Sequence, residues 1–145
     1  MARVFALLAA LLLLPVCAQA ADKTPDILPK FERAAIRNVI SAQLRAFRND
    51  DAERAFSYAT PSMQNYMGSA AAFLDIVKAS YPSVYRLRDM QFRELEVIDG
   101  ELVQKTFFIG PQGEAILGLY YMVKQPDGQW KINGCTLTDA PDRSI

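Results

Sequence analysis

The side chains that could perform acid–base chemistry in this 145-residue chain are carboxylates, phenols and amines, because the sequence contains no histidine. That absence excludes histidine-based nucleophilic triads and histidine-ligated zinc, copper or haem. The two cysteines, Cys17 and Cys135, are too few for a structural zinc site or an iron–sulfur cluster. We therefore expect no metal and no cofactor. The chemistry that remains is proton transfer between carboxylates and tyrosines, or binding without reaction.

Gln43 is the best single candidate for a binding residue. Ile36, Ile40 and Phe47 recur at helical spacing, and Gln43 falls on the same face of that helix. A buried amide requires hydrogen-bond partners. Gln43 either binds a ligand in a cavity or satisfies a backbone carbonyl, and the sequence leaves both interpretations open.

Six tyrosines supply phenols that suit the rim of an apolar cavity holding a flat, partly polar ligand. Ordinary core packing with one hydrogen bond each is the commoner role of such residues. Because neighbouring strand residues face opposite sides, at most one of Tyr120 and Tyr121 points into a cavity. The candidate pocket residues that we select are Gln43, Tyr58, Tyr66, Tyr85, Tyr120 and Trp130.

Two carboxylates, Glu94 and Glu96, share one phase of a predicted strand, and such a pair does acid–base work when burial separates the two pKa values. Their alternation with apolar residues favours the solvent side of the sheet instead. Cys135 has no histidine to act as its base, so we expect a small buried hydrophobic residue there. No residue is assigned as catalytic.

Helices in the first half of the chain must position the first of these side chains. Asp26 is the expected N-cap of a long helix with Pro29 in its first turn. Asp50 is the expected N-cap of the second helix, with Glu53 completing a capping box, and this capping accounts for the local acids without a bound cation. Ser69 is the expected cap of the fourth helix. The predicted helices cover residues 28–48, 52–59, 61–66 and 70–80, and residues 83–87 form a loop.

The second half of the chain changes to the alternation typical of strands. Asp99-Gly100 predicts a two-residue hairpin, and a change of phase near Arg93-Glu94 predicts a bulge. The third strand is apolar on both faces, which predicts an interior position covered on both sides, and Gly118 within it indicates a bend or a close backbone approach. The predicted strands cover residues 90–98, 102–109, 115–123 and 129–138.

This order predicts an α+β fold in which N-terminal helices, one of them long, pack on a curved four-stranded antiparallel sheet in the shape of a cone. Residues 28–138 form the single domain, between a flexible N-terminal segment at 21–27 and a flexible tail at 139–145.

The first 20 residues predict export. Arg3 precedes an apolar run at 4–16 that is too short to span a bilayer, and Ala18-Gln19-Ala20 is a signal-peptidase pattern. Lipoprotein processing requires a small residue before its cysteine, whereas Val16 precedes Cys17. We expect a periplasmic or secreted protein, cleaved after Ala20, that contacts the membrane only during export.

Cleavage would leave about 125 residues, enough for one domain with a substantial core. The full chain has 16 basic and 16 acidic residues, a balance that disfavours nucleic acid as a partner. Cys135 would remain alone, so no intrachain disulfide can form.

One face of the long helix carries positive charge. Such a stripe is usually a solvated surface, and the alternative is contact with an anionic partner or a membrane surface. Its members are Lys30, Arg33, Arg37, Ser41, Arg45 and Arg48.

Three segments carry a family resemblance: AFSYATPSMQ at 55–64, YPSVYR at 81–86 and WKINGC at 130–135. They resemble the bacterial family called domain of unknown function 4864, over residues 36–137, and these motifs carry no known chemistry. The order of elements also resembles the nuclear transport factor two-like superfamily of cone-shaped folds, which includes ketosteroid isomerases, dehydratases, polyketide cyclases and many non-enzymatic domains. The resemblance implies acid–base residues inside the cone in the enzymes, but no catalytic position of theirs is matched here.

The sequence thus favours a non-catalytic module that binds a small apolar or amphipathic molecule, or another protein. The alternative is an isomerase- or dehydratase-like enzyme that uses cone-lining tyrosines and a carboxylate. A third interpretation is a structural module that forms a homodimer through an exposed apolar sheet face.

Overall fold

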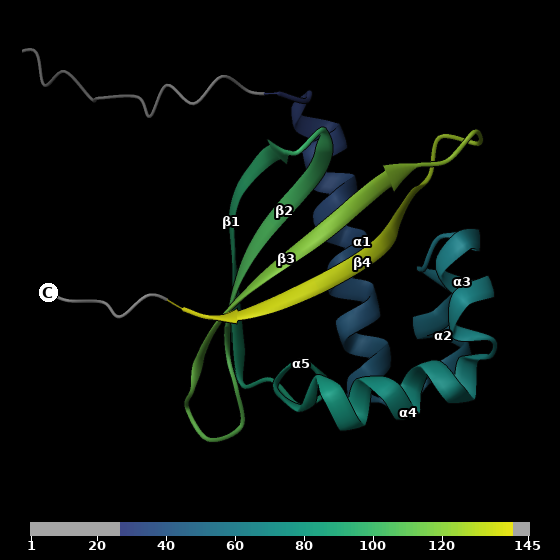
Figure 1. The fold of residues 1–145 in the computed structure, drawn as a ribbon. Helices are drawn as coiled ribbons and strands as arrows, with labels where there is room; N and C mark the ends of the chain where they lie inside the picture. The colour runs from purple at the N-terminus through teal and green to yellow at the C-terminus, as the bar shows by residue number, and fades with distance from the viewer. Residues whose placement is uncertain (1–26, 141–145) are drawn as a thin grey trace, which may run out of the picture.

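The computed structural model describes residues 27–140, in which five helices precede four strands (Figure 1). The predicted leader with Cys17, the Asp26 cap and the end of the tail lie outside the described residues. No helix within 27–140 has both the length and the apolar character needed to cross a membrane. The elements are α1 (Lys30–Arg48), α2 (Ala52–Ser57), α3 (Pro61–Met67), α4 (Ala70–Ser80), α5 (Pro82–Tyr85), β1 (Asp89–Ile98), β2 (Glu101–Ile109), β3 (Ala115–Lys124) and β4 (Trp130–Asp139).

Side-chain caps begin α3 and α4 where the sequence predicts these helices. The Ser69 hydroxyl accepts a hydrogen bond from the Ala72 amide at 3.1 Å, and the Thr60 hydroxyl accepts one from the Met63 amide at 3.2 Å. Gly68 ends α3 with a φ of 87°, a conformation that favours glycine. The predictions for these two helices are confirmed.

Two local predictions are wrong. Asp51, not Asp50, caps α2, since its carboxylate accepts a hydrogen bond from the Arg54 amide at 3.0 Å. Asp50 instead adopts a left-handed φ of 55°, which turns the chain between α1 and α2. The segment expected to be a loop contains α5, whose four residues are too few to show helical periodicity.

The strands form an antiparallel sheet in the order β1-β2-β3-β4, so the α+β prediction is confirmed, and the sheet is open rather than closed. Asp99 and Gly100 make the predicted two-residue hairpin with φ values of 52° and 81°. The predicted bulge is also confirmed, because the β1–β2 register shifts between Phe92 and Leu95. A second shift, between Tyr121 and Met122 against β4, is not predicted by the sequence.

The core lies between α1 and one face of the sheet. Ile36 and Ile40 of α1 are fully buried, as are Phe108 of β2 and Tyr120 of β3. Figure 1 shows α1 behind the sheet and the other helices grouped near the C-terminal end of α1.

The opposite face of β3 contradicts the expectation that both its sides are covered. Leu117 and Leu119 are only half-buried, whereas Gly118 and Tyr120 on the other face are buried. Among residues 27–140, α1 covers one face of the sheet and no helix covers the other, so apolar residues on both faces of β3 indicate an interior strand but not a second covering layer.

Candidate functional site

A cavity of about 320 Å³ opens between the helices and the edge strand β4. Helix α1 contributes its inward face, α3 and α4 form the walls, and the sheet forms the floor. Its lining is mainly aliphatic, aromatic and thioether side chains, and no charged residue among 27–140 belongs to it. The lining residues are Gln43, Phe47, Ala59, Met63, Tyr66, Met67, Phe73, Ile76, Val77, Tyr81, Val84, Tyr120, Tyr121, Ile132, Gly134, Cys135 and Thr136.

Gln43 lies in this lining and is almost fully buried, with 3% of its surface exposed. Its Nε2 donates a hydrogen bond to the Ala55 carbonyl of α2 at 3.2 Å. Its Oε1 accepts no hydrogen bond from any residue within 27–140. The amide therefore fulfils the structural role and still offers one acceptor beside the cavity.

Tyr120 and Cys135 form the polar part of the floor. They are paired across β3 and β4, and both side chains are screened from solvent. Burial raises the pKa of the Cys135 thiol to about 12 and raises the pKa of the Tyr120 phenol well above its usual range. Both groups are neutral at physiological pH, and the thiol is too weakly acidic to act as a nucleophile.

Three of the six sequence-predicted pocket residues line the cavity: Gln43, Tyr120 and Tyr66, which lies at the mouth and is 84% exposed. Tyr58, Tyr85 and Trp130 do not line it. Tyr85 and Trp130 instead donate hydrogen bonds to the carboxylates of Asp50 and Glu32. Selection by residue type cannot separate a cavity phenol from one that pairs with a surface charge.

Several lining residues were not selected from the sequence. Met63 and Met67 lie four apart on α3, a spacing that places both on one helix face. Tyr121 lines the cavity together with Tyr120, contrary to the expectation that only one would. Tyr121 is paired with Gly134 on the edge strand, and because Gly134 has no side chain, the cavity extends past this edge to reach Tyr121.

The predicted carboxylate pair does not take part in this site. Glu94 is exposed, and Glu96 forms an ion pair with Lys105 at 2.9 Å. Residues 27–140 also contain no group of three or more acidic or cysteine side chains that could hold a metal ion.

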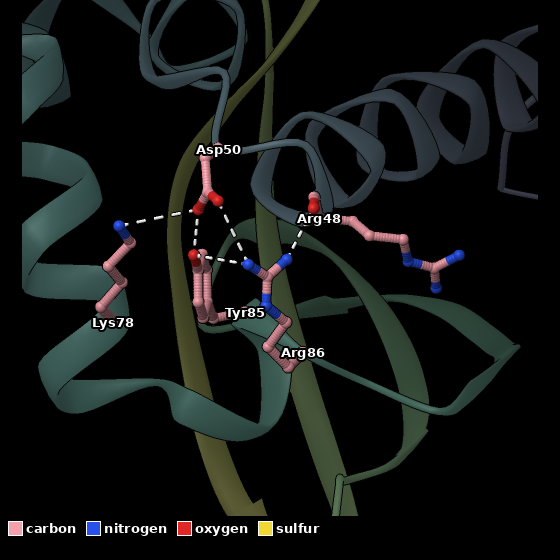
Figure 2. Close-up of polar contacts among 5 residues, drawn as sticks. All are labelled: Arg48, Asp50, Lys78, Tyr85 and Arg86. Atoms are coloured by element: carbon pink, nitrogen blue, oxygen red, sulfur yellow. Dashed lines mark hydrogen bonds and ion pairs between the residues drawn. The ribbon is translucent and has the colours of Figure 1, made fainter.

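A second cluster of polar side chains surrounds Asp50 at the turn between α1 and α2 (Figure 2). The Asp50 carboxylate accepts a hydrogen bond from the Tyr85 hydroxyl and one from Arg86 at 3.2 Å, and it lies 3.6 Å from the Lys78 ammonium. Arg86 also donates to the Arg48 carbonyl at 2.6 Å and stacks on the Tyr85 ring at 4.3 Å. This cluster, the Asp50 cluster, ties α4 and α5 to the end of α1.

The Asp50 cluster lies just behind three residues of the cavity wall. Phe47, Val77 and Val84 line the cavity and are neighbours in sequence of cluster residues. Hydrogen bonding by Tyr85, followed by the charges of Arg86 and Lys78, lowers the pKa of Asp50. Asp50 is therefore ionised at neutral pH, and its contacts connect α1, α4 and α5, the helices that carry Phe47, Val77 and Val84. We call this set of contacts the ionised clamp.

The sequence model of Domain of unknown function (DUF4864) matches residues 30–145. The chain belongs to this family. The match begins at the first residue of α1 and includes every helix and strand described above. The resemblance found in the sequence is thus confirmed for DUF4864, and membership of the wider cone-fold superfamily stays a prediction. No curated protein and no solved structure matches the chain significantly.

Proposed function

We propose that this DUF4864 protein is an exported, non-catalytic domain that binds a small, largely apolar molecule in the cavity beside β4. The observation that carries this proposal is the cavity itself. Its volume of about 320 Å³ lies in the range of ligand sites, and its lining, within the described part of the chain, holds no ionised side chain. The predicted leader supports export, and mass spectrometry of the chain isolated from bacterial cells tests it by locating the N-terminus.

The polar groups of the cavity specify the chemistry of the ligand. Gln43 Oε1 is an acceptor, so a ligand with one hydrogen-bond donor is favoured. Tyr120 and Cys135 are neutral, so they offer no counter-charge to an anion or cation. Met63 and Met67 supply flexible thioethers that adapt to irregular apolar shapes. The best candidate is an uncharged aromatic or polycyclic molecule that carries one N–H or O–H group.

The enzyme alternative needs a carboxylate that converges with phenols in an enclosed site. No Asp or Glu within residues 27–140 lines the cavity. The raised pKa of Tyr120 also prevents its phenol from acting as a base near neutral pH. Binding without reaction is therefore the function that this cavity supports best.

Fluorescence of the uncharged dye N-phenyl-1-naphthylamine, whose single N–H is a donor, tests the proposal. The informative variant is Gly134→Leu. A Cβ at this position would contact Met63 at 3.6 Å and Tyr121 at 4.0 Å, so the backbone tolerates it while the rest of the leucine occupies the cavity. Thr138→Leu is the matched control, because Thr138 lies on the same face of β4 and does not line the cavity.

We expect wild type and Thr138→Leu to bind the dye with similar affinity, and Gly134→Leu to bind it at least about tenfold more weakly. Absence of dye binding by the wild-type protein would refute the proposal, as would equal loss in the two variants. Native mass spectrometry of protein from bacterial cells then identifies a retained molecule.

A further inference from the structure

The face of α1 that points away from the sheet is basic and contains no acid. Glu32 is the only carboxylate on this helix, and it is turned toward the sheet, where Lys124 and the Trp130 indole donate hydrogen bonds to it. The exposed residues of α1 are Lys30, Phe31, Ala34, Arg37, Asn38, Arg45 and Arg48. We call this set the basic face.

The four cations on the basic face are not neutralised. Lys30, Arg37, Arg45 and Arg48 form no ion pair with any residue of the described part of the chain. Arg37 lies at the margin of the basic face, where its guanidinium is over the Phe92 ring of β1 at 5.5 Å while the residue stays exposed. From Lys30 to Arg45 the helix extends about 22 Å, so these charges form a line along one side of the molecule.

Two large apolar side chains lie at the N-terminal end of the basic face. Phe31 is 70% exposed and Ile27 is 42% exposed, and both are close in sequence to Lys30. Exposed aromatic and aliphatic side chains next to lysine and arginine are typical of helices that lie on a membrane surface.

We propose that the basic face docks the protein on an anionic phospholipid surface, with Phe31 and Ile27 entering the headgroup region and Lys30, Arg37 and Arg45 facing the phosphates. The contact outlasts export, and it is independent of the proposed ligand function. Gln43 and Phe47 reach the cavity from the opposite face of α1, so docking leaves the cavity accessible. Lipid is favoured over nucleic acid because nucleic acid would leave Phe31 and Ile27 exposed, whereas the headgroup region of a membrane buries such side chains.

Co-sedimentation with phosphatidylglycerol–phosphatidylcholine vesicles, compared with vesicles of phosphatidylcholine alone, tests this inference. The test variant is the double charge reversal Arg37→Glu/Arg45→Glu. The control, Arg93→Glu/Lys131→Glu, makes the same change in charge away from the basic face: Arg93 lies over Phe107, and the Lys131 ammonium donates a hydrogen bond to the Ser57 carbonyl of α2 at 2.7 Å. All proteins are expressed from the full-length chain and matched for N-terminus by intact mass and for folding by circular dichroism.

Wild type and control should bind the anionic vesicles and not the phosphatidylcholine vesicles, and binding should weaken as salt rises. Each basic residue near an anionic surface contributes on the order of a fivefold change in affinity, so the test variant should bind at least about tenfold more weakly. Phe31→Ser should weaken binding several-fold and leave its salt dependence unchanged. Equal losses in test variant and control, binding to phosphatidylcholine alone, or tighter binding to duplex DNA than to the vesicles would each overturn the proposal.

Discussion

The two polar atoms of the Gln43 amide have different roles. Its Nε2 donates a hydrogen bond to the Ala55 carbonyl, and its Oε1 remains available as an acceptor beside the cavity. We predict that Gln43→Leu lowers the free energy of unfolding by about 1 kcal/mol, the typical worth of a buried hydrogen bond. We also predict weaker binding of N-phenyl-1-naphthylamine, because the acceptor for its N–H is lost. Urea unfolding and dye titration measure the two effects. A raised melting temperature with unchanged dye affinity would show that Gln43 has no role in the pocket.

Single residues also show the limit of sequence-based interpretation. The close approach predicted at Gly118 is present, since a Cβ there would lie 2.5 Å from the Phe108 ring. The local pattern is enough for this, because a glycine inside an apolar strand often marks a point where another group approaches the backbone closely. Tyr85 and Trp130 are different, because each donates a hydrogen bond to a carboxylate outside the cavity, Asp50 and Glu32 respectively. These partners are distant in sequence, so no local pattern reveals them.

At the scale of elements, the Asp50 cluster joins α1, α4 and α5 through one carboxylate. Its pKa lies below the usual value of 3.8, chiefly because the Tyr85 hydroxyl donates to it. A lowered pKa in the folded state gives stability that is present above the unfolded pKa and is lost as pH falls through the folded pKa. Asp50→Asn keeps a residue that tolerates the left-handed φ of 55°, and it removes the charge together with one of the two acceptor oxygens.

We therefore predict that wild type is more stable than Asp50→Asn at neutral pH and that this advantage disappears in acid, below about pH 4. Thermal unfolding measured across this pH range gives the result. Asp75→Asn, on the exposed side of α4, is the control and should match wild type throughout. A difference between wild type and Asp50→Asn that does not change with pH would contradict an ionised clamp.

Element boundaries follow from the sequence where a cap or turn residue marks them, as Ser69, Gly68 and Asp99-Gly100 do. The error at Asp50 has a clear cause. Two adjacent aspartates can each cap α2, and the choice is made by Tyr85 and Arg86, which lie 35 and 36 residues further along the chain. Interactions of that sequence separation are not visible in local patterns.

For the molecule as a whole, the change from helical to alternating periodicity is sufficient to predict the α+β class and the order of strands. The cavity is not predictable in the same way. It depends on how α3 lies against the free edge of β4 at Gly134, and that arrangement is fixed by tertiary contacts such as the hydrogen bond from the Thr60 amide to the Ile132 carbonyl at 2.9 Å.

The same arrangement makes α3 the weakest wall of the cavity. None of its residues is buried. Its polar anchors are Thr60, which contacts Ile132 and Asn133 of β4, and Gln64, whose amide donates to the Phe56 carbonyl at 2.9 Å. A segment with so little buried apolar surface opens at a low free-energy cost.

We predict that the amides of α3 exchange hydrogen faster than those of α1, and that saturating N-phenyl-1-naphthylamine slows exchange in α3 far more than in α1. Hydrogen–deuterium exchange with mass spectrometry measures both segments in one experiment. If α3 and α1 were equally protected in the free protein, α3 would not be a wall that opens easily. A ligand would then have to enter the cavity past the edge strand at Gly134 and not by displacing α3.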